Sequence, residues 1–235
     1  MTNLGFWCSL PFVLPQALGV RRRTPRFSGP AEPLRGSFGP VPTARILGIG
    51  DSIIAGVGAI SAEQTLTAQF AACWSRATQT GVEWNALGRI GATTERIAAM
   101  AAQLPGDDSV DIILVSAGVN DITTLTRLSR WLGAIDRLLD HLREKHPRAS
   151  IVMLGIPPLE VFPALPAPLR QVMGSRARYF DRRVREHLRE QGGCRYLPIE
   201  HRPTANEFSA DGFHPSIASY ATLAASITEL ALSAR

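Results

Sequence analysis

Five short apolar runs, spaced along the chain from residue 44 onward, constrain the fold of this 235-residue chain more than any other feature. The runs occupy residues 44–50, 82–87, 110–117, 149–156 and 194–199, and segments with helical periodicity follow at 61–78, 93–104, 124–145, 169–191 and 216–233. Three of the runs are almost continuously apolar, which is typical of strands buried on both faces. This alternation predicts an α/β protein: a three-layer α/β/α domain with a doubly wound, parallel five-stranded sheet.

Polar and glycine-rich clusters follow four of the predicted strands. They are Gly50-Asp51-Ser52, the stretch "NALGRIGATT" at 85–94, "GVND" at 118–121 and "DGFHP" at 211–215. Each cluster alone is typical of a turn or a helix cap. A doubly wound sheet, however, binds its ligands at the carboxyl ends of its strands. Four such clusters at one edge therefore predict an assembled functional site.

The residue types in these clusters match the requirements of acyl transfer, which needs a nucleophile, a base, a group that orients the base, and donors for the oxyanion. Ser52 is the candidate nucleophile and His214 the candidate base. Asp211, three residues before His214, is the candidate partner of the imidazole. The candidate oxyanion donors are the backbone N–H groups of Ser52 and Gly91 and the side-chain amide of Asn120.

Four other histidines compete with His214 for the role of base. His141, His146 and His187 lie among charged residues on predicted helices, where a solvated position is expected. His201 follows the last predicted strand and is the serious rival, but it has no aspartate at the matching offset.

At this point the chain resembles the GDSL-type, or SGNH, hydrolases, a family named for a Ser, Gly, Asn and His in four ordered blocks. The blocks read "GDS" with Ser52, "GRIGATT" with Gly91, "GVND" with Asn120 and "DGFHP" with Asp211 and His214. Gly88 is an alternative to Gly91 in the second block. The resemblance spans roughly 44–233 and implies a flavodoxin-like sheet of strand order 2-1-3-4-5. It also implies serine-dependent ester hydrolysis without a metal or cofactor.

The resemblance leaves the substrate open, because the family includes esterases, lipases, thioesterases and carbohydrate deacetylases. The function expected here is hydrolysis of small-molecule, lipid or carbohydrate esters through an acyl-enzyme on Ser52. Acyl transfer to an alcohol or sugar by the same site is one alternative. A non-catalytic, flavodoxin-like binding module is the other, although the chain lacks both G-x-x-x-x-G-K-[ST] and a G-x-G-x-x-G after its first strand.

The loop at 157–168, "PPLEVFPALPAP", is the longest one available to shape a substrate pocket. Its five prolines make it stiff, and Leu159, Phe162 and Leu165 are expected to form an apolar rim. The candidate substrate-binding residues are Ile54, Val57, Phe162 and Phe213. The expected pocket is a shallow, apolar cleft that prefers short acyl chains.

The basic character of the chain belongs to its first 40 residues. They hold five arginines against Glu32 alone, which accounts for four of the five net positive charges of the whole chain. The rest of the chain is close to neutral, and no nucleic-acid-binding module is visible, so nucleic acid is not an expected partner.

Residues 4–20 are apolar but contain Pro11, Pro15 and Gln16, and they are short for a membrane span, which needs about 20 apolar residues. No positive charge precedes them and no small-x-small cleavage site follows, which argues against a standard signal peptide. Two interpretations stay open: N-terminal or peripheral membrane association, or a strap packed on the domain. The expected organisation is an apolar segment with an Arg/Pro-rich linker at 1–43 and a hydrolase domain at 44–235. The expected location is cytoplasmic or membrane-associated, with periplasmic export as an alternative.

Overall fold

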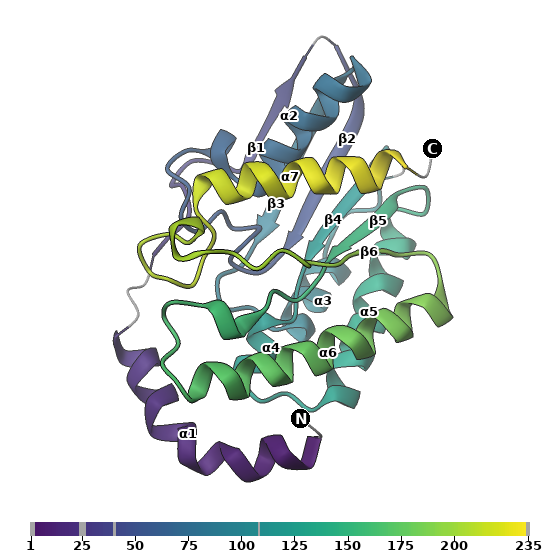
Figure 1. Ribbon diagram of the computed structural model, residues 1–235. Coiled ribbons are helices and arrows are strands. Elements are labelled where there is room, and N and C mark those ends of the chain that lie inside the picture. The colour runs from purple at the N-terminus through teal and green to yellow at the C-terminus, as the bar shows by residue number, and fades with distance from the viewer. Residues whose placement is uncertain (1–2, 24–26, 40, 108, 234–235) are drawn as a thin grey trace.

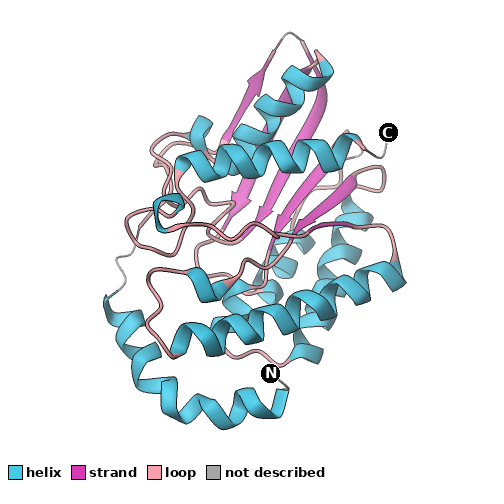
Figure 2. Ribbon diagram, viewed as in Figure 1, coloured by secondary structure: helices cyan, strands magenta, loops and turns pink. Residues whose placement is uncertain are grey.

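The computed structural model describes residues 3–23, 27–39, 41–107 and 109–233. In this part of the chain six strands form one sheet in the order β1-β3-β2-β4-β5-β6 (Figures 1 and 2). The strands are β1 (Arg35–Phe38), β2 (Pro42–Gly50), β3 (Gly81–Gly88), β4 (Ile112–Ser116), β5 (Ser150–Leu154) and β6 (Arg195–Leu197). Strands β2 to β6 are parallel, and their order confirms the predicted 2-1-3-4-5 arrangement.

The sheet has one strand more than the five that the sequence predicts. Strand β1 runs antiparallel to β3 at the edge, within the residues interpreted above as a linker. Its four residues, "RGSF", are largely exposed and show no apolar alternation. Because the side chains of this short strand are not buried in a core, they need not be apolar, and the sequence pattern does not indicate the strand. The sheet therefore includes residues that precede position 44.

Helices cover both faces of the sheet. Helices α3 (Thr94–Ala102), α5 (Leu128–Lys145) and α6 (Leu169–Gln191) lie on one face, and α2 (Leu66–Thr78) and α7 (Ile217–Leu232) lie on the other (Figure 1). Successive residues of β4 pack into opposite cores: Ile113 contributes to the core under α5, and Leu114 to the core under α7. Because successive strand side chains point to opposite faces, a strand covered on both sides must be apolar throughout.

The predicted helix at 124–145 begins four residues later in the structure, as α5, and a separate short helix precedes it. The short helix α4 (Val119–Thr123) and α5 are separated by Leu125, which has a positive φ of 61°. The amide of Thr126 there donates to the carbonyl of Asp121 at 2.8 Å, which closes the turn between the two helices. Three 3₁₀ turns complete the described elements: η1 (Ala62–Gln64), η2 (Leu159–Val161) and η3 (Ala205–Glu207).

The apolar N-terminal segment forms helix α1 (Asn3–Arg23), which contains Pro11 and Pro15. It packs along α6 (Figure 1), and Phe6 and Val13 are buried in the same core as α6. This is the arrangement expected of a strap on the domain. None of the helices described here has the length and apolar character needed to cross a membrane.

Candidate active site

Ser52 lies in a tight turn directly after β2. The amide of Asp51 donates to the carbonyl of Ser116 on the neighbouring strand β4, and the amide of Val57 donates to the carbonyl of Ser52. Small residues are required beneath this turn, since a Cβ on Gly50 would lie 2.4 Å from the Ser116 carbonyl oxygen and one on Gly88 would lie 1.9 Å from the Ala55 nitrogen. Gly88 therefore has a packing function.

Ser52, His214 and Asp211 form one hydrogen-bonded chain. The His214 Nε2 atom lies 2.8 Å from Ser52 Oγ, and its Nδ1 atom lies 2.6 Å from Asp211 Oδ2. The structure thus brings together the three residues that the sequence predicts as nucleophile, base and partner of the base, across 162 positions of the chain. With Nδ1–H donating to the carboxylate, Nε2 is free to accept the serine proton.

The second oxygen of Asp211 is held by its own loop. Asp211 Oδ1 accepts hydrogen bonds from Phe213 N at 2.8 Å, His214 N at 2.9 Å and Ser209 Oγ at 2.8 Å. Burial acts to raise the pKa of Asp211, but the hydrogen bonds from the His214 ring and from these donors outweigh it and lower the pKa well below its usual value. The carboxylate is therefore ionised wherever the imidazole can act as a base.

Asp51 is buried next to Ser52, but it does not belong to the hydrogen-bonded chain of Ser52, His214 and Asp211. Its Oδ1 atom accepts from Ile53 N at 3.1 Å and from Ser116 Oγ at 2.9 Å. Burial raises the pKa of Asp51 to about 6, although these two hydrogen bonds act in the opposite direction. Asp51 thus ties the turn after β2 to β4.

Asn120, at the start of α4, is oriented by the turn that follows β3. Its Nδ2 atom donates to the carbonyl of Ala92 at 2.9 Å, which uses one of the two amide hydrogens and leaves the other available. Asn120 also lines the cavity at Ser52. The next residue, Asp121, is buried and accepts from Thr94 N and Thr94 Oγ1, both at 2.8 Å, so it joins α4 to the start of α3.

Gly91 lies in the same turn, one residue before Ala92. Its φ is +73°, a conformation that favours glycine, and an added Cβ would meet nothing within 4 Å. The backbone conformation, and not the lack of space, therefore accounts for a glycine here. Because Asn120 bonds to Ala92, the candidate donors Gly91 and Asn120 belong to one connected unit.

The cavity at Ser52 has a volume of about 450 Å³. Phe162 and Phe213 line it, as the sequence predicts. The prediction for Ile54 and Val57 is wrong, because both side chains are fully buried beneath the nucleophile turn. Leu159 and Leu165 are also buried in the core and form no rim. The turn after β2 directs the side chains of Ile54 and Val57 into the protein interior, and the sequence does not indicate this direction.

The cavity extends away from Ser52 along helix α7. Most of its wall comes from residues that the sequence analysis did not assign to the site, among them Ile53, Leu154, Leu197, Pro203, Phe208 and Leu223. Ser219, Leu223 and Ser226 line it on successive turns of α7, so this wall is about 10 Å long. The cavity is therefore longer than the rim residues predicted from the sequence would make it. Leu154 and Leu197 are the last residues of β5 and β6, and Leu223 is at an apolar position of α7. From the sequence, all three would be predicted to be core residues.

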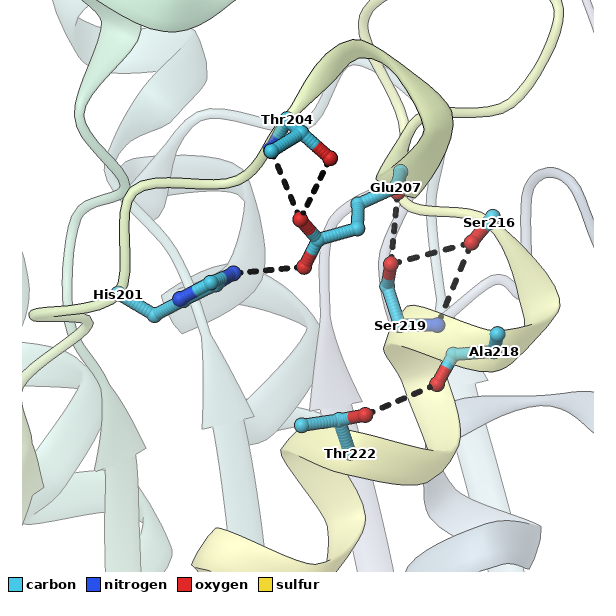
Figure 3. A network of polar contacts seen from close by, with 7 residues as sticks. All are labelled: His201, Thr204, Glu207, Ser216, Ala218, Ser219 and Thr222. Atoms are coloured by element: carbon cyan, nitrogen blue, oxygen red, sulfur yellow. Dashed lines mark hydrogen bonds and ion pairs between the residues drawn. The ribbon is translucent and has the colours of Figure 1, made fainter.

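His201, the rival base, lies on the wall of the same cavity but bonds elsewhere (Figure 3). Its Nε2 atom is 2.6 Å from Glu207 Oε1, while Glu207 Oε2 accepts from Thr204 N and Oγ1. The Glu207 carbonyl accepts from Ser219 Oγ at 2.7 Å, which joins this loop to α7. The structure thus pairs His201 with a carboxylate, and it pairs Ser52 with His214.

The sequence profile of the GDSL-like lipase/acylhydrolase family matches residues 49–222, which include Ser52, Asn120 and His214. The match covers well over half of the chain, and the chain therefore belongs to this family. The family resemblance inferred from the four sequence blocks is confirmed.

Among individual proteins, the GDSL-like esterase Rv1075c of Mycobacterium tuberculosis is 31% identical over 195 residues. The match covers 78% of this chain and 60% of the relative, so the chain spans about three fifths of that protein's length. A lipase from a goat rumen metagenome has the same fold, with a TM-score of 0.63 and 19% identity over 80% of this chain and 97% of its own. The carbohydrate acetylesterase Est24 of Sinorhizobium meliloti has a TM-score of 0.59 and 14% identity over 82% of this chain and 100% of its own. These likenesses confirm the predicted fold class.

Proposed function

We propose that this protein hydrolyses carboxylic esters through an acyl-enzyme formed on Ser52. The observation that carries the proposal is the hydrogen-bonded chain from Ser52 Oγ through His214 to Asp211, which opens on a largely apolar cavity. Membership of the GDSL-like lipase/acylhydrolase family supports the same reaction class.

In the proposed reaction, Ser52 Oγ attacks the ester carbonyl carbon while His214 Nε2 takes the hydroxyl proton. Asp211 stabilises the resulting imidazolium through its bond to Nδ1. The imidazolium then gives the proton to the leaving alcohol as the C–O bond breaks, and the acyl group stays on Ser52. Water, deprotonated by His214, attacks the acyl-enzyme and releases the acid, which restores the serine hydroxyl.

The oxyanion is proposed to bind to the backbone N–H groups of Ser52 and Gly91 and to the second amide hydrogen of Asn120. Since the bond to Ala92 fixes the Asn120 amide before substrate arrives, little reorganisation is needed as negative charge develops. Gly91 is proposed as an oxyanion donor because it is exposed and lies next to Ala92 in the turn after β3.

Replacing Asn120 with Ala is expected to lower kcat by about 10²–10³ with KM little changed, because one donor to the oxyanion is lost. Steady-state kinetics with p-nitrophenyl butyrate measure the two constants separately. Asn120→Asp is the matched comparison, since it keeps the shape and loses the N–H donors. A variant that loses substrate affinity with kcat intact would place Asn120 outside the oxyanion site.

The direct test of the proposed function is a panel of p-nitrophenyl esters assayed with and without a serine-directed phosphonate. Turnover that the phosphonate abolishes, with the adduct found by mass spectrometry on the peptide containing Ser52, is the expected result. Labelling of a different residue, or no turnover of any ester, would overturn the proposal in favour of a binding module. Adding glycerol or a sugar to the assay separates hydrolysis from acyl transfer, which yields a new ester.

The proposed preference for the length of the substrate's acyl chain rests on the shape of the cavity and not on the loop at 157–168. The short-chain preference expected from the sequence depended on an apolar rim of Leu159, Phe162 and Leu165, of which only Phe162 lines the cavity. We propose instead that an acyl chain of medium length extends past Phe208 toward Leu223, along the apolar wall beside α7.

The activity, measured as kcat/KM, is expected to rise from p-nitrophenyl acetate through butyrate to about octanoate and to level off before palmitate. Each methylene that becomes buried can contribute up to ~0.8 kcal/mol, which is roughly fourfold in kcat/KM. Leu223→Trp, which fills the far part of the cavity, should lower activity on octanoate while leaving acetate unchanged. A maximum at acetate, unaffected by this substitution, would contradict the assignment of the cavity to the acyl chain.

A further inference from the structure

Helix α1 exposes an apolar face to solvent. We define the α1 outer face as the exposed residues between positions 6 and 20: Trp7, Cys8, Pro11, Phe12, Leu14, Pro15 and Leu18. The exposed fraction is 82% at Phe12 and 48% at Leu18, which is high for side chains of this kind. None of these seven side chains is charged.

Two polar side chains in the middle of α1, Ser9 and Gln16, bond to backbone groups. Ser9 Oγ donates to the carbonyl of Phe6 within the helix. Gln16 Nε2 donates to the carbonyl of Ala167 at 3.0 Å, and its Oε1 atom accepts from Leu169 N at 3.1 Å. A surface helix in water normally places its apolar residues inward and its polar residues outward. Helix α1 is apolar on both sides, so its outer face suits an apolar medium.

The α1 outer face has a fixed position on the domain. Phe6 and Val13 are buried, and the guanidinium of Arg176 on α6 lies 4.4 Å from the centroid of the Phe6 ring. Arg176 also donates to the carbonyl of Thr126 at 2.6 Å, so the contact reaches the loop before α5. These contacts hold α1, and with it the α1 outer face, in one position on the domain.

The sequence of the N-terminal segment is positively charged. Residues 1–31 contain no aspartate or glutamate, and they contain arginines at positions 21, 22, 23 and 26. An apolar helix with a cluster of arginines at its end combines the two attractions that hold an interfacial helix on a bilayer: burial of apolar side chains and attraction to anionic headgroups. We propose that the α1 outer face binds an anionic phospholipid surface, with α1 lying in the plane of the interface.

This placement brings the cavity near the lipid. Gln16 joins α1 to Ala167 and Leu169, which border the loop that carries the cavity residue Phe162. In Figure 1, α1 lies on the side of the molecule toward which the parallel strands point. Ser52 is at the same edge, because β2 ends at Gly50. A protein bound through α1 would thus hold its cavity close to esters dissolved in the membrane.

The test is co-sedimentation of the full chain with vesicles of phosphatidylcholine alone and of phosphatidylcholine mixed with phosphatidylglycerol. Binding is expected to the mixed vesicles and to weaken with salt. Trp7 supplies an independent readout, because it is 39% exposed while Trp74, Trp84 and Trp131 are buried. Its emission should shift to the blue on binding, and Trp7→Phe should remove the shift.

Phe12→Glu is expected to weaken vesicle binding about tenfold or more, because a charge replaces an aromatic side chain that would enter the lipid on binding. Charge reversal at Arg22 should weaken it roughly fivefold, and only on anionic vesicles. The matched control is Val41→Glu: Val41 is 80% exposed and precedes β2, at the end of that strand away from Ser52.

Two results would overturn the proposal. One is equal binding of wild type, Phe12→Glu and Val41→Glu to anionic vesicles. The other is a dimer in light scattering that Phe12→Glu dissociates, without vesicle binding, which would assign the outer face to a second copy of the chain. Turnover of a water-soluble ester by Phe12→Glu should equal that of wild type, so failure of the membrane proposal leaves the proposed hydrolysis unaffected.

Discussion

Ser52→Ala is expected to lower kcat for p-nitrophenyl butyrate by on the order of 10⁴ or more, since the nucleophile and base of a catalytic triad act as a unit. The substitution removes the atom that bonds to His214 Nε2 at 2.8 Å and leaves the turn after β2 in place. His214→Ala should cause a loss of the same order, and the double variant should be no worse than either single one. Melting temperature should change little in Ser52→Ala.

Steady-state kinetics at saturating ester, together with thermal melting, measure both effects. The matched control is Ser129→Ala, which changes an exposed serine on the first turn of α5 and should keep full activity. If Ser52→Ala retained a tenth or more of the wild-type kcat, Ser52 could not be the nucleophile.

Asp211→Asn is expected to lower kcat by about 10³–10⁴ while the loop around it stays folded. The asparagine carbonyl oxygen can still accept from Phe213 N and His214 N, so the loop keeps its hydrogen bonds. The amide nitrogen would then face His214 Nδ1 and donate to it. The imidazole proton would have to move to Nε2, and a protonated Nε2 cannot accept a proton from Ser52.

A parallel substitution, Glu207→Gln, separates the two histidine–carboxylate pairs of the cavity. It alters the bond of Glu207 to His201 and should change kcat by no more than a few-fold. A larger loss from Glu207→Gln than from Asp211→Asn would make His201 the base and refute the assignment of His214.

The Asp211→Asn variant should also have a different pH dependence of stability. Hydrogen bonds hold the pKa of Asp211 below its usual value, so the carboxylate stabilises the folded state at neutral pH. This contribution is lost on acidification, starting as the pH falls below about 4, where the unfolded chain takes up the proton first. The gap in melting temperature between wild type and Asp211→Asn should therefore narrow between pH 5 and pH 3.

The predicted strands and the site at their ends were recognisable in the sequence because both depend on strong physical constraints. The strand β4 is buried on both faces and must be apolar at every position from Ile112 to Val115. The strands are parallel, so whatever follows their carboxyl ends gathers at one edge of the sheet. Ser52 and His214 could be placed together on this basis before any distance was known.

Other features depend on directions that sequence patterns do not encode. Strand β1 is paired on one side only, and it needs no apolar pattern. The break between α4 and α5 depends on the positive φ of Leu125. Leucine rarely adopts a positive φ, so the sequence does not predict this conformation. The sequence could not assign Ile54 and Val57 to the core or to the pocket, because the assignment depends on the direction in which the turn after β2 points their side chains. The cavity wall was missed because Leu154 and Leu223 are apolar residues at ordinary core positions.

The origin of the cavity wall has a consequence for how such a protein could acquire new substrates. Ser52 and Asn120 follow β2 and β4 in the middle of the sheet. Ser116 bonds to Asp51, the residue before Ser52, and Ala92 bonds to Asn120. The apolar wall comes instead from Leu154, Leu197 and Leu223, at the β6 edge of the sheet and on α7. Exchange of these side chains would reshape the space for the ester without disturbing the bonds that hold the reacting groups. If the proposed function holds, aliphatic substitutions at these positions would change the substrate range and leave the proposed catalytic residues unaltered.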